Sequence, residues 1–231
     1  MTRDAKAIIW DLDKTLYPYD QRFFAASKKA LTNVVQEYCP VLSPTEAFAY
    51  ASASYPMQTI SRLQQDFGHD PKRLFYAYFT YLDESFLEPD ARILRVAKQL
   101  QPHVKFGLLT HGNRDWSDRA IKRLGWDSLI PHAFRQTIDT MNHEKDTGSA
   151  ALEELLSVMA VLPDKTVVVD DKDRNLGPAA ALGCHTVLVT NRDPDPCMKV
   201  QHAQFVYDCA RDFLNDYKRN GFNLVRVRLK L

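Results

Sequence analysis

Short apolar runs rich in β-branched residues alternate along this chain with longer stretches of helical spacing, and this alternation limits the possible folds more than any other feature. The clearest runs are residues 7–10, 106–109, 166–169 and 186–189, with weaker ones at 133–138 and 205–207. Strand-like runs separated by helices are typical of βαβ units, whose parallel strands are buried on both faces. We therefore predict an α/β fold with a Rossmann-like parallel sheet.

A helical block interrupts this alternation. Four consecutive stretches show helical spacing with no strand-like run between them: residues 23–38, 44–54, 57–67 and 71–82. Such a block is too long for a simple crossover between two strands. We predict that residues 17–90 form an inserted all-helical cap domain, and that residues 1–16 and 91–231 form the core. Most of the dense aromatic residues of the block are expected to pack the small core of this cap, and the rest to line a substrate pocket.

Three of the clearest strands run directly into polar clusters. The clusters are Asp11-Leu12-Asp13-Lys14-Thr15, Thr110-His111-Gly112-Asn113, and the Asp-Asp-Lys-Asp-Arg-Asn string at 170–175. In an open parallel sheet, ligands bind just beyond the carboxyl ends of the strands. Neighbouring strands would therefore bring the three clusters into one crevice.

The carboxylates of this crevice indicate a metal site. Asp11, Asp13, Asp170 and Asp171 would repel one another strongly unless a cation lay among them. Oxygen ligands without His or Cys suit a hard ion, and Mg²⁺ typically takes a few carboxylates together with phosphate oxygens and waters. We therefore predict a Mg²⁺ site held by these four residues.

A carboxylate beside Mg²⁺ can attack phosphorus, and this defines the predicted chemistry. We predict that Asp11 is the nucleophile, that it forms an aspartyl-phosphate, and that water then cleaves this intermediate. Thr110 and the turn at Gly112 are placed to hold the phosphoryl oxygens, because a helix begins there. A lysine should neutralise the charge of the transition state. Lys145, which follows the weak strand at 133–138, is our candidate, and Lys172 is the alternative.

In type and order, these motifs resemble those of the haloacid dehalogenase superfamily. The string at 11–15 matches the first motif, DxDx followed by Thr or Val. Thr110 matches the second motif, Lys145 the third, and Asp170-Asp171 with Asn175 the acidic fourth. The resemblance covers the whole chain, and the helical block is similar to the C1-type cap of that family.

The resemblance implies a role for each site residue. Asp11 would be nucleophile and metal ligand, and Asp13 the general acid that protonates the leaving oxygen and later activates water. Asp171, with Asp170, would complete the Mg²⁺ site, and Asn175 would support it from behind. An Asp two residues after the nucleophile is typical of the phosphatases of this family rather than of its dehalogenases.

A narrower resemblance concerns the substrate. Residues 11–18, DLDKTLYP, are similar to the DLDNTLYP of the pyrimidine 5′-nucleotidase branch, which implies a nucleoside 5′-monophosphate. Three residues depart from the usual pattern: Lys14 replaces Asn or Gly, His111 replaces Asn, and Asp146 replaces Pro. The backbone N–H of His111 can still contribute to phosphoryl binding. Two alternatives stay open: a phosphatase for another small metabolite, such as a sugar phosphate or phosphoglycolate, and a non-catalytic binding protein on the same scaffold.

Charge and cysteine content limit the partners. The chain has 30 basic and 29 acidic residues, a net charge of +1 that gives no reason to expect a nucleic-acid polymer or a membrane surface as partner. Neither a signal peptide nor an apolar run of about 20 residues is recognisable, and the four cysteines show no CxxC spacing. We expect a cytoplasmic protein that binds a small phosphomonoester, as a monomer or homodimer. The alternating apolar and basic residues at 224–231 predict an edge strand.

Overall fold

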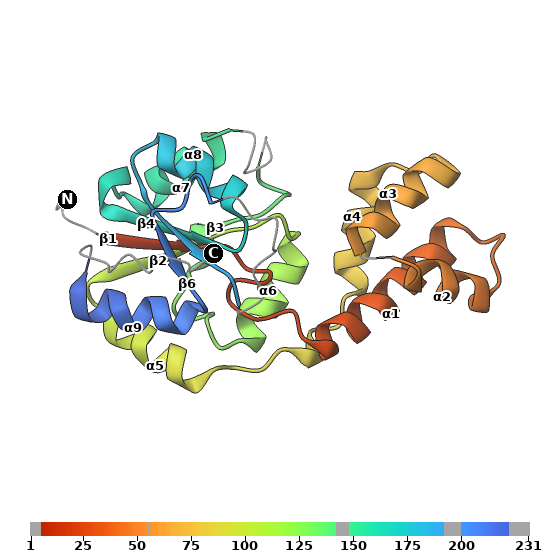
Figure 1. The fold of residues 1–231 in the computed structure, drawn as a ribbon, viewed down its shortest axis with the longest axis horizontal. Helices are drawn as coiled ribbons and strands as arrows, with labels where there is room; N and C mark the ends of the chain where they lie inside the picture. The colour runs from red at the N-terminus through yellow and green to blue at the C-terminus, as the bar shows by residue number, and fades with distance from the viewer. Residues whose placement is uncertain (1–5, 55, 142–147, 192–199, 222–231) are drawn as a thin grey trace.

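Six parallel strands form one sheet at the centre of the fold (Figure 1), in a computed structural model that describes residues 6–54, 56–141, 148–191 and 200–221. The strands are β1 (Lys6–Trp10), β2 (Val104–Leu109), β3 (Arg135–Gln136), β4 (Thr166–Asp170), β5 (His185–Val189) and β6 (Phe205–Tyr207). Their order across the sheet is β3-β2-β1-β4-β5-β6. The predicted α/β fold is confirmed, including the two weak strands, although β3 has only two residues.

Strand β1 lies between β2 and β4, and helices cover both of its faces (Figure 1). Ile8 and Trp10 pack on the side of helices α5 (Ala91–Leu100), α6 (Arg114–Arg123) and α9 (Ala210–Asn220). Ala7 and Ile9 pack on the other side, with α7 (Ala150–Met159) and α8 (Gly177–Ala181). Burial on both faces explains why this strand is apolar at every position after Lys6 rather than alternating.

The four cap helices stand together as a separate group to the right of the core (Figure 1). They are α1 (Gln21–Tyr38), α2 (Pro44–Ser52), α3 (Pro56–Phe67) and α4 (Pro71–Tyr81). Side chains of Asp20, Ser43 and Asp70 accept hydrogen bonds from the first free N–H groups of α1, α2 and α4, which fixes where these helices begin. The inserted helical cap is confirmed, while its limits at residues 17 and 90 stay a prediction.

The aromatic residues of α4 have two different environments. Tyr78 and Phe79 are buried and Phe75 packs partly buried against them, as expected for the core of the cap. Tyr76 and Tyr81 are exposed instead. Helical spacing indicated an apolar face but gave no means of telling which tyrosines lie at its margin.

Helix α6 of the core holds the end of the cap. The guanidinium of Arg119 donates to the backbone oxygens of Phe79 at 3.0 Å and Leu82 at 2.8 Å, and it pairs with Glu84. Arg123 donates to the backbone oxygen of Leu87 at 3.1 Å. The chain that returns from the cap is therefore fastened to the core through its own backbone.

No helix in the described ranges is long and apolar enough to cross a membrane. The alternating segment at 224–231, predicted to be an edge strand, lies outside the described residues.

Strand β2 passes close to α7 at Gly107. A Cβ atom at this position would lie 2.8 Å from Sδ of Met159 and 3.4 Å from Cγ1 of Ile9. We expect Gly107→Ala to lower the free energy of unfolding by about 1–2 kcal/mol, because the methyl group overpacks the interface and the adaptable Met side chain relieves only part of the strain.

Urea denaturation measures this change. Gly148→Ala is the matched control, because a Cβ atom there meets nothing within 4 Å, and its effect should stay within about 0.5 kcal/mol. Equal stabilities for the two variants would contradict close packing of β2 against α7.

Candidate active site

The predicted polar clusters meet at the carboxyl-terminal edge of the sheet, because three adjacent strands end there at the same level. Trp10 of β1 pairs with Leu108 of β2 on one side and with Val169 of β4 on the other. The next residue, Asp11, donates its backbone N–H to the oxygen of Val169 at 2.8 Å. The ladder therefore carries Asp11 to the level of the last residue of β4, Asp170.

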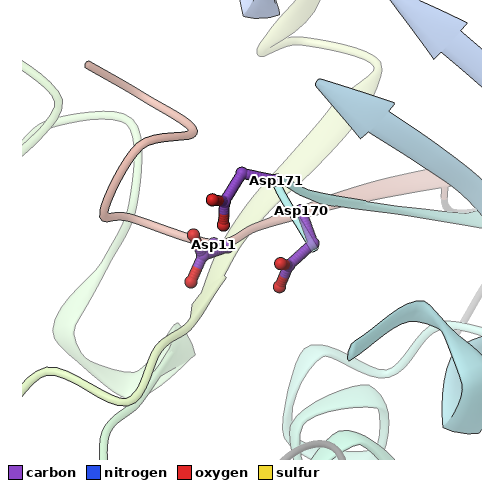
Figure 2. A group of neighbouring side chains, drawn as sticks. All are labelled: Asp11, Asp170 and Asp171. Atoms are coloured by element: carbon purple, nitrogen blue, oxygen red, sulfur yellow. The ribbon is translucent and has the colours of Figure 1, made fainter. Parts of the chain in front are cut away.

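Three carboxylates lie together at this edge (Figure 2). Oxygen atoms of Asp11, Asp170 and Asp171, one from each residue, lie within 4.8 Å of one another, and the residues are 6%, 3% and 9% exposed. Like charges buried this closely raise the energy of the folded chain unless a cation offsets them. The all-oxygen set fits a hard divalent ion such as Mg²⁺. The structure thus brings together three of the four predicted metal ligands.

Neighbouring side chains orient two of these carboxylates. Thr15 donates its hydroxyl to Oδ2 of Asp11 at 2.9 Å. Asn175 donates its amide to Oδ1 of Asp170 at 2.9 Å, and the backbone N–H of Lys172 reaches the same oxygen at 2.9 Å. Asn175 therefore lies behind the predicted metal site, where a supporting role requires it.

Asp13, the fourth predicted ligand, has a different environment. Its Oδ1 atom accepts hydrogen bonds from the phenol of Tyr17 and from the indole N–H of Trp116, the latter at 3.0 Å. Sequence reasoning missed both donors. Tyr17 lies only four residues from Asp13, whereas Trp116 is separated from it by 103 residues and gave no signal.

The loop after β1 contains a left-handed residue. Lys14 has a φ of 63°, a conformation that an L side chain rarely adopts, and Asn191 donates its amide to the backbone oxygen of Lys14. This explains physically why Asn or Gly is usual at this position in the resembling family. The cation at Lys14 is a departure of sequence that leaves the turn intact.

The second cluster forms a tight turn at the start of α6. The buried hydroxyl of Thr110 accepts the backbone N–H of Gly112 at 3.0 Å. The side chain of Asn113 accepts the N–H of Trp116 at 2.8 Å, which caps the helix, and donates to the backbone oxygen of Tyr76 in the cap at 3.3 Å. A turn that opens a helix in this way favours an anion, as the prediction for Thr110, His111 and Gly112 requires.

Of the two lysine candidates, only Lys172 lies in the described residues. Lys172 is exposed beside the carboxylates. Lys145 lies outside the described residues, so its predicted position at the site stays a prediction.

Aromatic side chains continue from the loop after β1 into α1 of the cap, where the ring of Tyr19 stacks on that of Phe23. Burial raises the pKa of Tyr19 well above its usual value, and the charge of Asp13 raises it further. The ring of Tyr19 lies 6.3 Å from that of Phe24 on α1. Phe24 in turn lines a groove of about 560 Å³ between α1 and α2, with Lys28 and Phe48 among its other lining residues.

The chain resembles known proteins both in sequence and in fold. Residues 5–183 match the family model described as haloacid dehalogenase-like hydrolase. A search of curated proteins found none that matches. Solved structures that share the fold include a putative β-phosphoglucomutase from Thermotoga maritima, at 15% identity and a TM-score of 0.64, covering 93% of this chain and 99% of that one.

Two further structures agree in fold. A HAD-superfamily hydrolase of subfamily IA from Geobacter sulfurreducens PCA has 16% identity and a TM-score of 0.57, covering 92% of this chain and 96% of its own. A putative phosphoglycolate phosphatase from Lactobacillus plantarum has 19% identity and a TM-score of 0.60, covering 93% and 99%. At these identities the similarity shows the fold alone.

Repulsion within the carboxylate cluster should be measurable as stability. We expect Asp171→Asn to raise the free energy of unfolding of the metal-free protein by about 1 kcal/mol or more, because it removes one of three closely buried like charges. Urea denaturation in the presence of EDTA measures the change.

A nearby carboxylate supplies a control with the opposite sign. Asp173 accepts the backbone N–H groups of Gln201 at 2.9 Å, His202 at 3.1 Å and Ala203 at 2.9 Å, so its charge is stabilised. Asp173→Asn should lower the free energy of unfolding by about 1–3 kcal/mol. If both variants were destabilised alike, repulsion would not be the governing interaction at Asp171.

Proposed function

The chain belongs to the haloacid dehalogenase-like hydrolases, and from this premise we propose that it is a Mg²⁺-dependent phosphomonoester hydrolase working through an aspartyl-phosphate on Asp11. The observation that carries the proposal is the group of three buried carboxylates beyond β1 and β4. Membership of the family supports a phosphatase-type enzyme. The acidic cluster adds the place where the phosphoryl group would be transferred.

Asp11, Asp170 and Asp171 would hold the ion, since their oxygens already converge. When bound, Mg²⁺ offsets the repulsion between an anionic nucleophile and an anionic phosphate. Thr15 donates to Oδ2 of Asp11 at 2.9 Å, which holds the carboxyl group in a fixed orientation for attack. The turn at Thr110–Gly112 would receive the phosphoryl oxygens at the start of α6, and Lys145 would neutralise charge as it develops.

The reaction has two balanced steps. A carboxylate oxygen of Asp11 bonds to phosphorus while the bond from phosphorus to the leaving oxygen breaks, and Asp13 gives its proton to that oxygen. Water then attacks the phosphorus of the aspartyl-phosphate and gives its proton to Asp13. The bond between Asp11 and phosphorus breaks, which releases inorganic phosphate and restores both carboxyl groups.

For the substrate we propose a nucleoside 5′-monophosphate, with a pyrimidine base favoured by the similarity of residues 11–18 to the nucleotidase branch. The exposed rings of Phe24 and Phe48 in the groove of the cap support this, because such rings stack on planar bases. A sugar phosphate or phosphoglycolate is the second candidate. It is favoured by structural similarity to a putative β-phosphoglucomutase and a putative phosphoglycolate phosphatase.

A panel of phosphomonoesters with Mg²⁺ separates these candidates. Nucleoside monophosphates, sugar phosphates and phosphoglycolate are compared by kcat/KM, and phosphate release is measured. A preference of at least about tenfold for pyrimidine nucleotides supports the first candidate. Release from none of them would support a non-catalytic binding protein on this scaffold instead.

Replacement of the nucleophile should abolish turnover. We expect Asp11→Asn to lower kcat by at least about 10³-fold, because an amide does not form the aspartyl-phosphate. Its urea unfolding should remain cooperative, which shows that the fold is kept. Asp164→Asn is the matched control, since this exposed carboxylate precedes β4 at the opposite edge of the sheet, and it should keep full activity. Wild-type activity in Asp11→Asn would overturn the mechanism.

Removal of the metal should stop the reaction. We expect EDTA to abolish phosphate release and added Mg²⁺ to restore it, because the buried carboxylates repel the substrate phosphate without the ion. Isothermal titration of Mg²⁺ into metal-free protein tests binding without relying on activity, and Asp171→Asn should weaken it at least about tenfold. Undiminished turnover in EDTA would contradict the metal requirement.

A further inference from the structure

One oxygen of Asp13 is held by two side chains from distant parts of the chain. Oδ1 accepts the phenol of Tyr17, from the loop after β1, and the indole N–H of Trp116, from α6, at 3.0 Å. Both donors are buried, with Trp116 0% and Tyr17 5% exposed. Two converging donors on one atom restrict rotation of the whole carboxyl group.

The rings of both donors are themselves packed in place. The ring of Phe86, between α4 and α5, lies 5.8 Å from the ring of Tyr17 and 6.1 Å from that of Trp116, on which it stacks at 22°. The ring of Phe79, on α4, also stacks on that of Trp116, with the ring centres 6.4 Å apart.

The turn that is proposed to receive phosphate also sets the position of Trp116. Asn113 accepts the backbone N–H of Trp116 at 2.8 Å. A Cβ atom on Gly112 would lie 3.0 Å from Cδ1 of the indole, so the absence of a side chain there gives the ring its place. The indole thus joins the phosphoryl-binding turn to Asp13.

We propose that Tyr17 and Trp116 are positioning residues, which hold Oδ1 of Asp13 so that Oδ2 carries the proton to the leaving oxygen of the ester. The inference rests on the proposed function and extends it to two residues to which the resemblance assigns no role. Proton transfer requires the carboxyl within about 2.6–3.2 Å of the oxygen it protonates, and a small displacement of a catalytic group lowers the rate strongly. Fixing one oxygen defines the direction of the other.

The test compares two kinds of leaving group in Tyr17→Phe and Trp116→Phe. Nitrophenyl phosphate releases a stable phenolate that needs little protonation, whereas an alkyl phosphate releases a basic alkoxide that needs it fully. The alkyl substrate is the one that the wild-type chain hydrolyses fastest in the panel. The parameter is kcat/KM, because it reports the steps up to departure of the leaving group and excludes the later role of Asp13 as base.

We expect kcat/KM for the alkyl phosphate to fall at least about tenfold further than for nitrophenyl phosphate in both variants. In an Asp13→Asn background, Tyr17→Phe should cause no further loss, since the phenol acts only through Asp13. Tyr207→Phe is the matched control. Its phenol also donates to a carboxylate, that of Asp216 at 2.5 Å, but it lies on the outer strand β6. Its loss should leave the ratio of kcat/KM for the two substrates unchanged.

Each other outcome has a defined meaning. Equal losses on both substrates, or no loss, would overturn the positioning role and leave a structural one. Additive losses in the Asp13→Asn background would do the same. If Trp116→Phe does not fold, Tyr17→Phe decides, because it removes a single oxygen and keeps the ring. If the wild-type chain releases phosphate from neither substrate with Mg²⁺ present, the proposed function itself fails.

Discussion

Repulsion among Asp11, Asp170 and Asp171 is the constraint around which the rest of the molecule is arranged. Parallel pairing forces β1 and β4 to end at the same level, and the helices on both faces of the sheet leave the strands no freedom to separate. The stability that holds these charges together therefore comes from elsewhere, mostly from apolar burial around Trp10 and its neighbours. An energetically unfavourable cluster maintained by a well-packed scaffold is typical of a functional site.

The main elements of this arrangement were predictable from sequence because each has a local cause. Strand β4 is apolar at three consecutive positions, 167–169, as burial on both faces requires, and Asp170 and Asp171 follow directly. The cap helices begin at capping residues such as Ser43, whose side chain and that of Glu46 bond to each other's backbone. Strand β3 was a weak prediction because it has two residues, and its Arg135 is buried by pairing with carboxylates rather than by apolar contact.

The remainder depends on contacts between distant residues, which no local pattern encodes. The indole of Trp116 reaches Asp13 only because α6 packs beside the loop after β1. The left-handed turn at Lys14 is held by the amide of Asn191, which lies 177 residues away in the sequence. The sequence itself showed only a lysine where Asn or Gly is usual. The side chain of Asn113 likewise reaches the backbone oxygen of Tyr76 only because the cap meets the core there.

The joint between α6 and the cap has a consequence for how such a chain can diverge. Arg119 and Arg123 donate hydrogen bonds to the backbone oxygens of residues 79, 82 and 87. Every residue type has such an oxygen. Apart from the pairing of Arg119 with Glu84, the attachment therefore does not depend on which side chains the cap carries. The side chains that line the groove on α1 and α2 can therefore be replaced while the attachment of the cap to the core is kept. A graft of a foreign cap onto this core would need to match the path of the backbone at the joint more than its sequence.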